Sequence, residues 1–383
     1  MQPDDEGFLY PITDPHTCND CGLCRQACAV NPREGIVKET PWRADGSKPL
    51  SVFAAWHLDE KIRRDSSSGG AFTALAQNVL ARGGVVVGAA YEGQFAVRHV
   101  LIESAEDLYR LRGSKFVQSG VPESLYRQIR NQLKQGRLVL FSGTPCQVGG
   151  LRFFLRQSYK NLLCCDLICV GVPSHNLFQK YIHWECGRVG KPLVTCEFRN
   201  KASGWKDHSM VLQFSGETVV RERFERNAYC RAFRLRIALR HACYDCNFKG
   251  ISRVGDLTIG DFWGADETYP EYDRDDKGTS LILVNTEQGR AWLDDCQRSL
   301  FLGSADLEPA IAGNPMLIQS SRRPAERETF YLDLEKMPFK ALVRKYHLHG
   351  PTKFSIMASR AKSILKRIIR GKLLIRRGTA ELK

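Results

Sequence analysis

Residues 138–150, LVLFSGTPCQVGG, decide the fold class. Leu138 to Phe141 form an uninterrupted apolar run, which is typical of a strand buried on both faces of a sheet. Pro145 suits the first turn of a helix, and an apolar pattern continues to Gln157. The stretch therefore predicts a buried strand that leads through a short turn into a helix, which is the unit of layered α/β proteins.

The same alternation continues on both sides of this stretch. Apolar runs predict strands at residues 50–56, 85–91, 97–102, 137–143 and 162–171, and helical patterns lie within 66–84, 122–136, 144–157 and 174–186. We therefore predict a layered α/β core over residues 46–190, with largely parallel strand pairing.

The pattern changes after residue 190. Shorter β-like segments occur at 193–200, 208–214 and 217–224, followed by a helical segment at 224–240, and then by a further strand group with one helix at 256–264 and 280–293. This favours a smaller α+β region over residues 191–340.

Residues 18–28, CNDCGLCRQAC, carry Cys18, Cys21, Cys24 and Cys28. The spacing C-x2-C-x2-C-x3-C is typical of [4Fe-4S] binding in bacterial ferredoxins, so residues 1–45 form a ferredoxin-type segment. A zinc site and unliganded thiols are the alternatives. The run resembles the second half of a two-cluster module, and Ala29 replaces the usual proline, so Cys28 is the least secure ligand.

A second pair, Cys243 and Cys246, has no further pair nearby in sequence. Two thiols cannot complete a cluster, and Cys146 and Cys169, at the ends of predicted strands, are the candidates best placed to join them. At the start of a helix, Cys146 should have a lowered thiol pKa, although a buried inert thiol is the alternative. The other cysteines are interpreted as thiols that pack in the protein interior and bind no metal: Cys164, Cys165, Cys186, Cys196, Cys230 and Cys296.

Two loops carry groups that suit phosphate. Ser66–Gly70 precedes a predicted helix, so hydroxyls and backbone N–H groups meet the positive end of the helix dipole. Gly113–Ser119 contains Lys115, which can meet an anion. Serines that merely cap a helix and a plain glycine turn are the alternatives.

Composition limits the class of protein. With 383 residues and 43% apolar residues, the chain is globular, and no stretch reaches 18 uninterrupted apolar residues. The 14 cysteines lie in metal-type spacings and no signal peptide is evident, so we expect a reducing, cytoplasmic location.

The net charge of +14 is concentrated in residues 351–383, within the predicted tail at 341–383. There ten basic residues oppose one acidic residue, and Ile364, Leu365, Ile368 and Ile369 recur at helical spacing. A basic amphipathic helix contacts an anionic membrane surface or an acidic partner. A helix packed on the protein body is the alternative, and the uneven charge argues against specific nucleic-acid binding.

Six motifs together resemble one known family. SSSGGAFTALA, LRGSKFVQS, FSGTPCQVGGL, DLICVGVPS, CYDCNFKG and DLTIGDFWG occur in its order, between residues 8 and about 300. The chain is similar to the beta-subunit family of coenzyme F420-reducing hydrogenases and dehydrogenases. That family includes formate dehydrogenase beta subunits and 7-hydroxymethyl chlorophyll a reductase.

The resemblance implies an iron–sulfur flavoprotein with FAD in the α/β core and one or two [4Fe-4S] clusters. It implies that Cys146, Cys169, Cys243 and Cys246 hold a cluster near the flavin, and that Asp261 and Trp263 shape the same region or support a strand end. The implied flavin-binding residues are Ser66, Ser67, Ser68, Gly69, Gly70, Gly113, Ser114, Lys115, Gln118, Ser119, Gly143 and Thr144.

The implied reaction passes electrons between clusters and flavin and exchanges hydride with an organic acceptor such as coenzyme F420. Val170 departs from the family's CHGVPS motif, which points to a different acceptor. The expected partners are ferredoxin or another redox protein, which the arginine-rich stretch 221–240 would attract unless it is a solvated helix face. The alternative is a subunit of a homo- or hetero-oligomer that is not active alone.

Overall fold

The computed structural model describes residues 1–26, 28 and 48–350. The prediction of a basic amphipathic helix at the C-terminus and the inference from Ala29 therefore lie outside the described residues.

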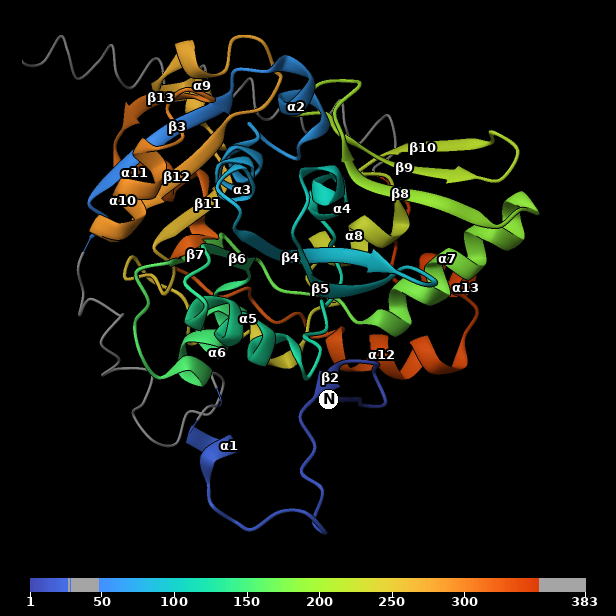
Figure 1. Cartoon of the computed structure of the whole chain (residues 1–383). Helices are drawn as coiled ribbons and strands as arrows, with labels where there is room; N and C mark the ends of the chain where they lie inside the picture. Colours follow the sequence, from blue (N-terminus) through green and yellow to red (C-terminus); the bar gives the residue numbers. More distant parts are fainter. Residues whose placement is uncertain (27, 29–47, 351–383) are drawn as a thin grey trace, which may run out of the picture.

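An eight-stranded sheet forms the centre of the described chain, in the order β13-β3-β12-β11-β7-β6-β4-β5 (Figure 1). Its strands are β3 (Ser51–His57), β4 (Val85–Glu92), β5 (Ala96–Ile102), β6 (Val139–Gly143), β7 (Leu162–Leu167), β11 (Leu257–Asp261), β12 (Ser280–Val284) and β13 (Leu300–Ala305). The predicted parallel pairing is found for β4, β6, β7 and β11, whereas β5, β12, β3 and β13 pair antiparallel with their neighbours. The β4–β5 connection is too short for a crossover helix, which makes that pair a hairpin.

Helices cover both faces of this sheet, as expected of a layered α/β fold. On one face, α3 (Ala71–Ala81), α4 (Leu108–Leu111) and α10 (Glu287–Asp294) share a buried cluster with Val86 and Leu140. On the other face, α5 (Leu125–Lys134) and α6 (Pro145–Leu155) pack with Val87 and Phe141. Successive residues of β4 and β6 thus point to opposite faces, and both faces are apolar because both are covered.

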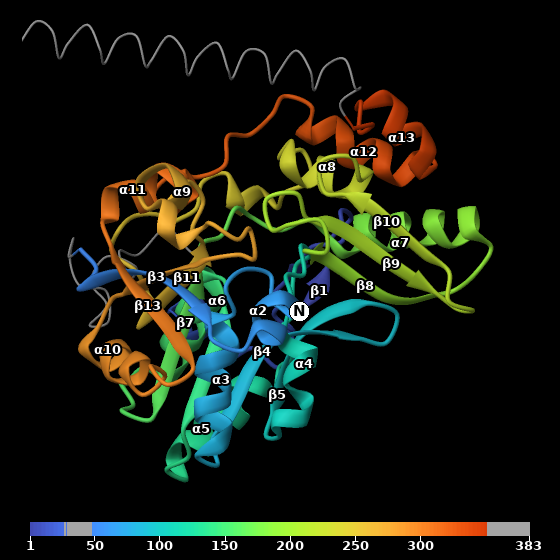
Figure 2. The same ribbon diagram turned by 90° about the horizontal axis from the view of Figure 1, so that it is seen from above.

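A second, smaller sheet lies beside the first (Figure 2). It consists of β8 (Leu193–Asn200), β9 (Ser209–Phe214) and β10 (Val219–Arg223) in antiparallel order. Its buried face packs on α7 (His175–Val189), α8 (Ala228–Arg234), α12 (Arg327–Lys336) and α13 (Phe339–Lys345). The remaining short α-helices are α1 (Leu23–Gln26), α2 (Glu60–Asp65), α9 (Ala265–Thr268) and α11 (Leu307–Gly313).

Two sequence expectations differ from the observed elements. The helix expected over 224–240 is confined to α8, because the chain leaves it after Arg234 and Arg236 adopts a positive φ of 66°. Also, β11, β12 and β13 complete the sheet that β3 to β7 begin, so the segments 46–190 and 191–340 share one sheet.

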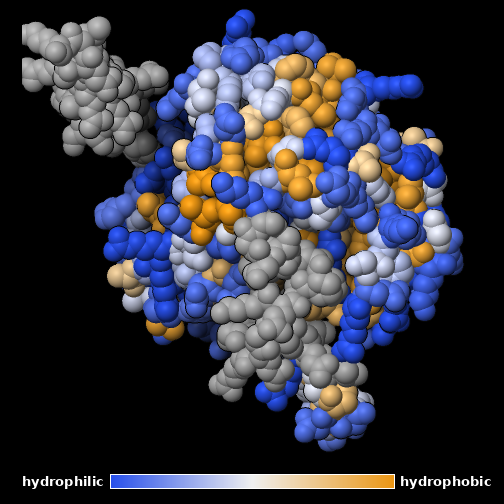
Figure 3. Space-filling view, turned by 90° about the vertical axis from the view of Figure 1, so that its left-hand side faces the viewer, coloured by the Kyte–Doolittle hydropathy of each residue, from blue (hydrophilic) through white to orange (hydrophobic). Residues whose placement is uncertain are grey.

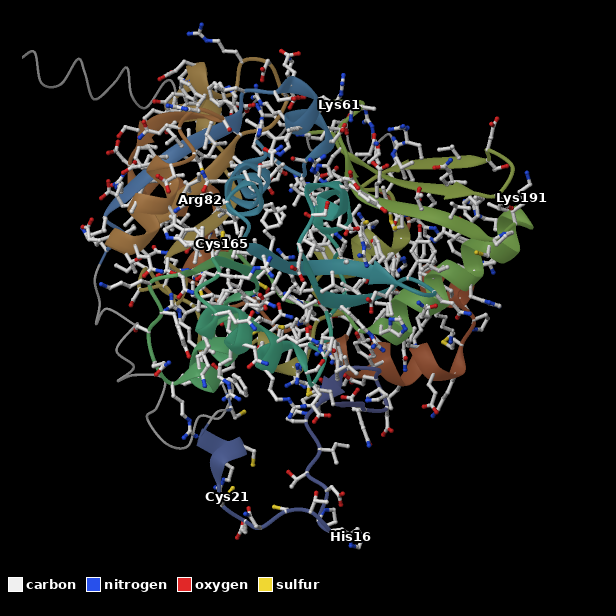
Figure 4. All side chains as sticks on the ribbon, viewed as in Figure 1. His16, Cys21, Lys61, Arg82, Cys165 and Lys191 are labelled. Carbon is white, nitrogen blue, oxygen red and sulfur yellow. The ribbon has the colours of Figure 1, made fainter. Side chains whose placement is uncertain are left out.

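The N-terminal residues form a hairpin docked on the body. β1 (Gln2–Pro3) pairs with β2 (Leu9–Tyr10), and Phe8 is fully buried in the cluster under the small sheet. Glu6 forms a bidentate ion pair with the buried Arg327. Beyond the hairpin the chain runs away from the body, and Figure 4 shows Cys21 on this projecting segment.

The outer side of β13 and α10 carries apolar residues among charged ones (Figure 3). Leu50 and Leu58, which flank β3, are exposed. Among the described helices, none is both long and apolar enough to cross a membrane.

Candidate functional site

The predicted site residues gather along one edge of the large sheet. β3, β11, β7 and β6 all end at this edge, because β3 and β11 each pair antiparallel with β12 while β11, β7 and β6 are parallel. In open α/β sheets, ligands bind at the carboxyl ends of the strands. The edge is therefore the place where the predicted loops can act together.

The two predicted phosphate loops contact each other here. The backbone N–H of Ser114 donates to the Ser67 hydroxyl oxygen at 2.7 Å, and the two hydroxyl oxygens are 2.9 Å apart. Ser66 and Ser68 donate their hydroxyls to the carbonyls of Ile62 and Thr279. Loops 47 residues apart in sequence thus form one surface.

The alternative interpretation was that these serines cap the following helix, and the structure does not show such a cap. The N-cap of α3 is Gly70, with φ of 94°, and no side chain among the described residues caps this end of α3. The Thr73 N–H donates to the Gly70 carbonyl, whereas the N–H groups of Ala71 and Phe72, at the positive end of the α3 dipole, have no acceptor in the described part of the chain, which suits a phosphate.

Lys115 folds back onto its own loop. Its ammonium donates to the carbonyls of Arg112 and Gly113 at 2.8 and 3.2 Å and lies over the Tyr91 ring. Burial lowers the pKa of Lys115 to about 7. The ammonium therefore lies within the loop surface rather than extending into solvent.

A histidine that sequence analysis missed joins the second and third motifs. His99, fully buried on β5, lies 2.7 Å from the Ser119 hydroxyl and 3.1 Å from the Ser142 carbonyl. Because a carbonyl only accepts, Nε2–H donates to Ser142 and Nδ1 accepts from Ser119. Burial lowers the pKa of His99 to about 4, so the ring is neutral. The only sequence signal was a histidine within an apolar strand.

Gln118 contacts protein rather than facing open space. Its amide accepts from the Leu9 N–H at 2.7 Å and donates to the Leu9 carbonyl at 3.2 Å. Its backbone N–H donates to the Pro173 carbonyl. Gln118 therefore fixes the N-terminal hairpin to the site edge, because both functional groups of its amide are used there.

Four cysteines from separate segments come together at this edge: Cys146, Cys169, Cys243 and Cys246. We call these four the core cysteines, to distinguish them from the thiols packed inside strands and helices. Burial raises the pKa of Cys243 to about 12, and the nearby Cys169, Cys146 and Cys246 thiols add to the effect. Burial raises the pKa of Cys169 to about 11, with the same kind of contribution from Cys146 and Cys246. The side chains are thus close enough to interact electrostatically.

The expected lowering of the Cys146 pKa is wrong. The Cys146 side chain reaches the surface, yet protein atoms surround most of it, and this burial raises its pKa. The Thr144 hydroxyl, 3.1 Å from Sγ, opposes the effect. Desolvation of a thiolate outweighs the helix dipole at this position.

Two basic side chains lie beside the core cysteines. Lys249 donates to the carbonyls of Cys169 and Met316, and nearby cysteines oppose the lowering of its pKa by burial. Arg240, which opposes the rise in the Cys146 pKa, stacks over the Tyr10 ring at 4.0 Å. Their positive charge favours a group that carries several thiolates.

A single metal ion and a [4Fe-4S] cluster make different demands on these thiols. Among residues 1–26, 28 and 48–350, no group of three or more His, Cys, Asp or Glu side chains is arranged to hold one metal ion. A zinc ion needs thiolates about 2.3 Å from a common centre. In a [4Fe-4S] cluster each thiolate binds a different iron, so the thiols stand farther apart. Cys18, Cys21 and Cys24 are exposed and Cys28 is half-buried.

Asp261 and Trp263 of the last motif support the end of β11. Asp261 forms an ion pair with Arg199 and accepts from the Trp205 indole N–H at 3.1 Å. Trp263 stacks on Trp205 with ring centroids 4.5 Å apart. In the DLICVGVPS motif, the carbonyl of Val170 accepts from Ser321, and Gly171, with φ of 132°, lies against Cys243.

Two family models match the chain. The N-terminal model of the coenzyme F420 hydrogenase/dehydrogenase beta subunit matches residues 52–126, and the C-terminal model matches residues 136–309. The chain belongs to this family. All six motifs lie within the matched ranges, whereas the cysteine run at 18–28 lies outside them. The beta-subunit fold is thus that of an oxidoreductase family.

Solved structures also match the chain. One of them is a chain in the xenon-derivatised F420-reducing [NiFe] hydrogenase complex from Methanosarcina barkeri, with 16% identity and a TM-score of 0.47. The similarity covers 75% of the present chain and 99% of that chain. No curated protein matches the chain.

Proposed function

We propose that the chain is an iron–sulfur flavoprotein oxidoreductase that moves electrons between [4Fe-4S] clusters and FAD and exchanges hydride with an organic acceptor. One observation supports this most strongly. Thr144, a proposed flavin-binding residue, is in hydrogen-bond contact with Cys146, a proposed cluster ligand, at 3.1 Å. The two proposed cofactor sites would therefore share a boundary at the start of α6.

The residues at the edge divide between the two cofactors. Ser66–Gly70, Gly113–Ser119, Gly143 and Thr144 would hold FAD, with its phosphates toward the uncapped end of α3. The core cysteines would hold one [4Fe-4S] cluster, and Cys18, Cys21, Cys24 and Cys28 would hold another. When bound, FAD exchanges electrons singly with a cluster and in pairs with a hydride acceptor.

The protein's own groups prepare this edge. His99 orients the Ser119 hydroxyl, whose proton is committed to Nδ1, so its lone pairs face other donors. Arg240 and Lys249 offset the thiolate charge of the core cysteines. Fixed charges in a buried setting cost no reorganisation when an electron arrives.

The second candidate is an electron-transfer subunit that needs a partner chain for its chemistry. Two observations favour it: the family is named for a beta subunit, and Cys18, Cys21 and Cys24 are exposed on a projecting segment. Exposed ligands would leave a cluster accessible to ferredoxin or to another redox protein. In both cases we propose a cytoplasmic protein, with membrane contact only through the tail.

Anaerobic purification tests the proposal. Flavin, iron and sulfide are measured per chain, and dithionite-reduced protein is examined by electron paramagnetic resonance. FAD together with a cubane signal supports it, whereas a protein that retains neither after reconstitution contradicts it. Adding reduced ferredoxin and coenzyme F420 tests the first candidate further, because turnover identifies an enzyme, whereas flavin reduction without turnover means that the chemistry requires a partner chain or a different acceptor.

A further inference from the structure

Arg199, at the end of β8, has unused hydrogen-bond donors in the protein interior. Its side chain is 6% exposed, and Nη1 donates to the Asp261 carboxylate. Nε and Nη2 are buried and have no hydrogen-bond partner in the described part of the chain. Leaving buried donors unpaired destabilises a fold, so a position of this kind calls for a further acceptor.

The two unused nitrogens belong to one edge of the guanidinium. Nε–H and one Nη2–H point in parallel, at the spacing that binds both oxygens of a carboxylate or two oxygens of a phosphate. Arg188 shows the same edge in use, since its Nε and Nη2 both donate to one oxygen of the Glu185 carboxylate, at 3.0 and 2.6 Å. We call this pair of N–H groups, Nε–H and Nη2–H, the fork. In Arg199 the fork has no acceptor in the described part of the chain, because the Asp261 carboxylate accepts only from Nη1.

Neighbouring groups fix the direction of the fork. Asp261 is held by the Trp205 indole N–H, and its backbone carbonyl accepts from Asn314 at 3.0 Å. The guanidinium lies over the Trp263 ring, 5.3 Å from its centroid, and Trp263 in turn stacks on Trp205. Rotating Arg199 toward another acceptor would break these contacts, so the fork is preorganised.

The fork lies beside the proposed cofactor loops and in a positive environment. Lys201, two residues further on, donates to the carbonyls of Arg63, Ser68 and Lys277 and so ties this corner to the Ser66–Gly70 loop. Burial and the Arg199 charge lower the pKa of His208 to about 4, which keeps that ring neutral. Asp261 is the ion-pair partner of Arg199, and burial together with the Arg199 charge lowers the pKa of Lys201 to about 7.

We propose that Arg199 is the receptor for an oxyanion, a phosphate or carboxylate group of a ligand bound at the carboxyl edge of the large sheet. The group belongs either to the pyrophosphate of the flavin dinucleotide or to the organic acceptor. The proposal deepens the proposed function, on which the identity of the ligand rests, while the fork itself is a property of the chain.

The test compares Arg199→Lys and Arg199→Gln with the wild-type full chain. Lysine keeps a positive charge for Asp261 but lacks the fork, so this variant separates bidentate hydrogen bonding from charge attraction alone. Circular dichroism checks that each variant is folded. Arg188→Lys is the matched control, because its fork already has a protein partner.

FAD and riboflavin, which lacks phosphate, are titrated into flavin-depleted protein. Inorganic phosphate and succinate are titrated into flavin-loaded protein and followed by tryptophan fluorescence, since Trp263 lies under Arg199.

Both Arg199 variants are expected to weaken one ligand at least tenfold while Arg188→Lys does not. Weaker FAD with unchanged riboflavin assigns the fork to the pyrophosphate, and unchanged FAD with weaker phosphate or succinate assigns it to the acceptor. Unchanged FAD affinity together with no Arg199-dependent binding of either anion overturns the proposal. A wild-type protein that binds no flavin would instead contradict the proposed function, and the two anions would still test Arg199.

Discussion

At the scale of the residue, cysteines that are close in sequence have different structural roles. Cys164 and Cys165 are fully buried within β7, whereas Cys169, four residues beyond Cys165, lies at the site edge with the other core cysteines. The strand ends at Leu167, so a thiol inside it packs in the core and a thiol just after it reaches the edge. Position relative to the strand end, more than local sequence, separates a structural thiol from a candidate ligand.

His99 should make the protein sensitive to acid. Its pKa is about 4 in the folded protein and about 6.5 when unfolded, so between these values only the unfolded chain binds the proton. Stability is therefore lost as the pH falls from 6.5 to 4, by about 3 kcal/mol in total for this group. In urea unfolding at pH 7.5 and pH 5, His99→Gln should lose less stability on acidification than the wild type.

His208 acts in the same direction, since its pKa is also lowered to about 4. His99→Gln should therefore reduce the acid sensitivity without abolishing it. Equal losses in variant and wild type would show that His99 is protonated in the folded protein.

Gly69 should tolerate no side chain. A Cβ there would overlap the Ala55 carbonyl oxygen and lie 2.7 Å from the Ser280 nitrogen. Because both neighbours are backbone atoms of paired strands, Gly69→Ala must displace the Ser66–Gly70 loop, at a cost of about 1–3 kcal/mol. We expect a lower thermal midpoint and a lower flavin content.

Gly187→Ala is the matched control for this change. Gly187 lies in α7, where a Cβ meets no atom within 4 Å, so alanine should be neutral or stabilise by up to about 1 kcal/mol. Equal flavin content in the two variants would mean that the loop is not part of a flavin site.

At the scale of the element, the N-terminal hairpin acts as an anchor for the cysteine run. Phe8 packs on the Tyr331 ring in the buried cluster that also contains Leu177 and Phe178, and Gln118 pairs with the backbone of Leu9. The first ten residues are therefore part of the body, and only the segment after them projects.

Phe8→Ala should release this anchor. Loss of a fully buried phenylalanine costs about 3–5 kcal/mol, which exceeds what a two-strand hairpin contributes alone. Limited proteolysis should then cut the first 26 residues at least ten times faster, while the rest of the chain stays resistant. Ile12→Ala, at a position 60% exposed, is the control and should leave the cutting rate unchanged. Equal rates for both variants would show that Phe8 does not hold the segment.

At the scale of the whole molecule, the large sheet assembles the site. Cys146 follows β6, Cys169 follows β7, and Cys243 and Cys246 lie in the segment between α8 and β11. That segment is held against the edge by the bridge between Pro173 and Leu239 and by the hydrogen bond from Arg240 to the Val172 carbonyl. The core cysteines can meet only when the sheet is formed.

Cys243→Ser should remove one cluster and leave the other. Iron and sulfide per chain should fall by the content of one [4Fe-4S] group, with part of the paramagnetic signal retained from the N-terminal cysteines. Cys186→Ser, at a half-buried thiol of α7 away from the core cysteines, should keep the full content. Identical iron content in the two variants would exclude Cys243 as a ligand.

The sequence alone determined what local patterns encode. The 138–150 stretch predicts β6 and α6 correctly, because a buried strand and a Pro-initiated helix leave their signature in consecutive residues. The family also follows from sequence, since its motifs are short and keep their order. The spacing of the N-terminal cysteines likewise predicts a cluster without reference to any other segment.

Only the tertiary structure decided what depends on distant partners. It showed that β12 and β13 join the large sheet, that Gly70 rather than a serine begins α3, and that burial raises the Cys146 pKa. It also revealed His99 and Arg199, whose neighbours come from segments 20 to 62 residues away. The burial, the pKa and the unpaired donors of a side chain depend on the residues that folding brings near it. The pattern of neighbouring residues in the sequence therefore does not encode them.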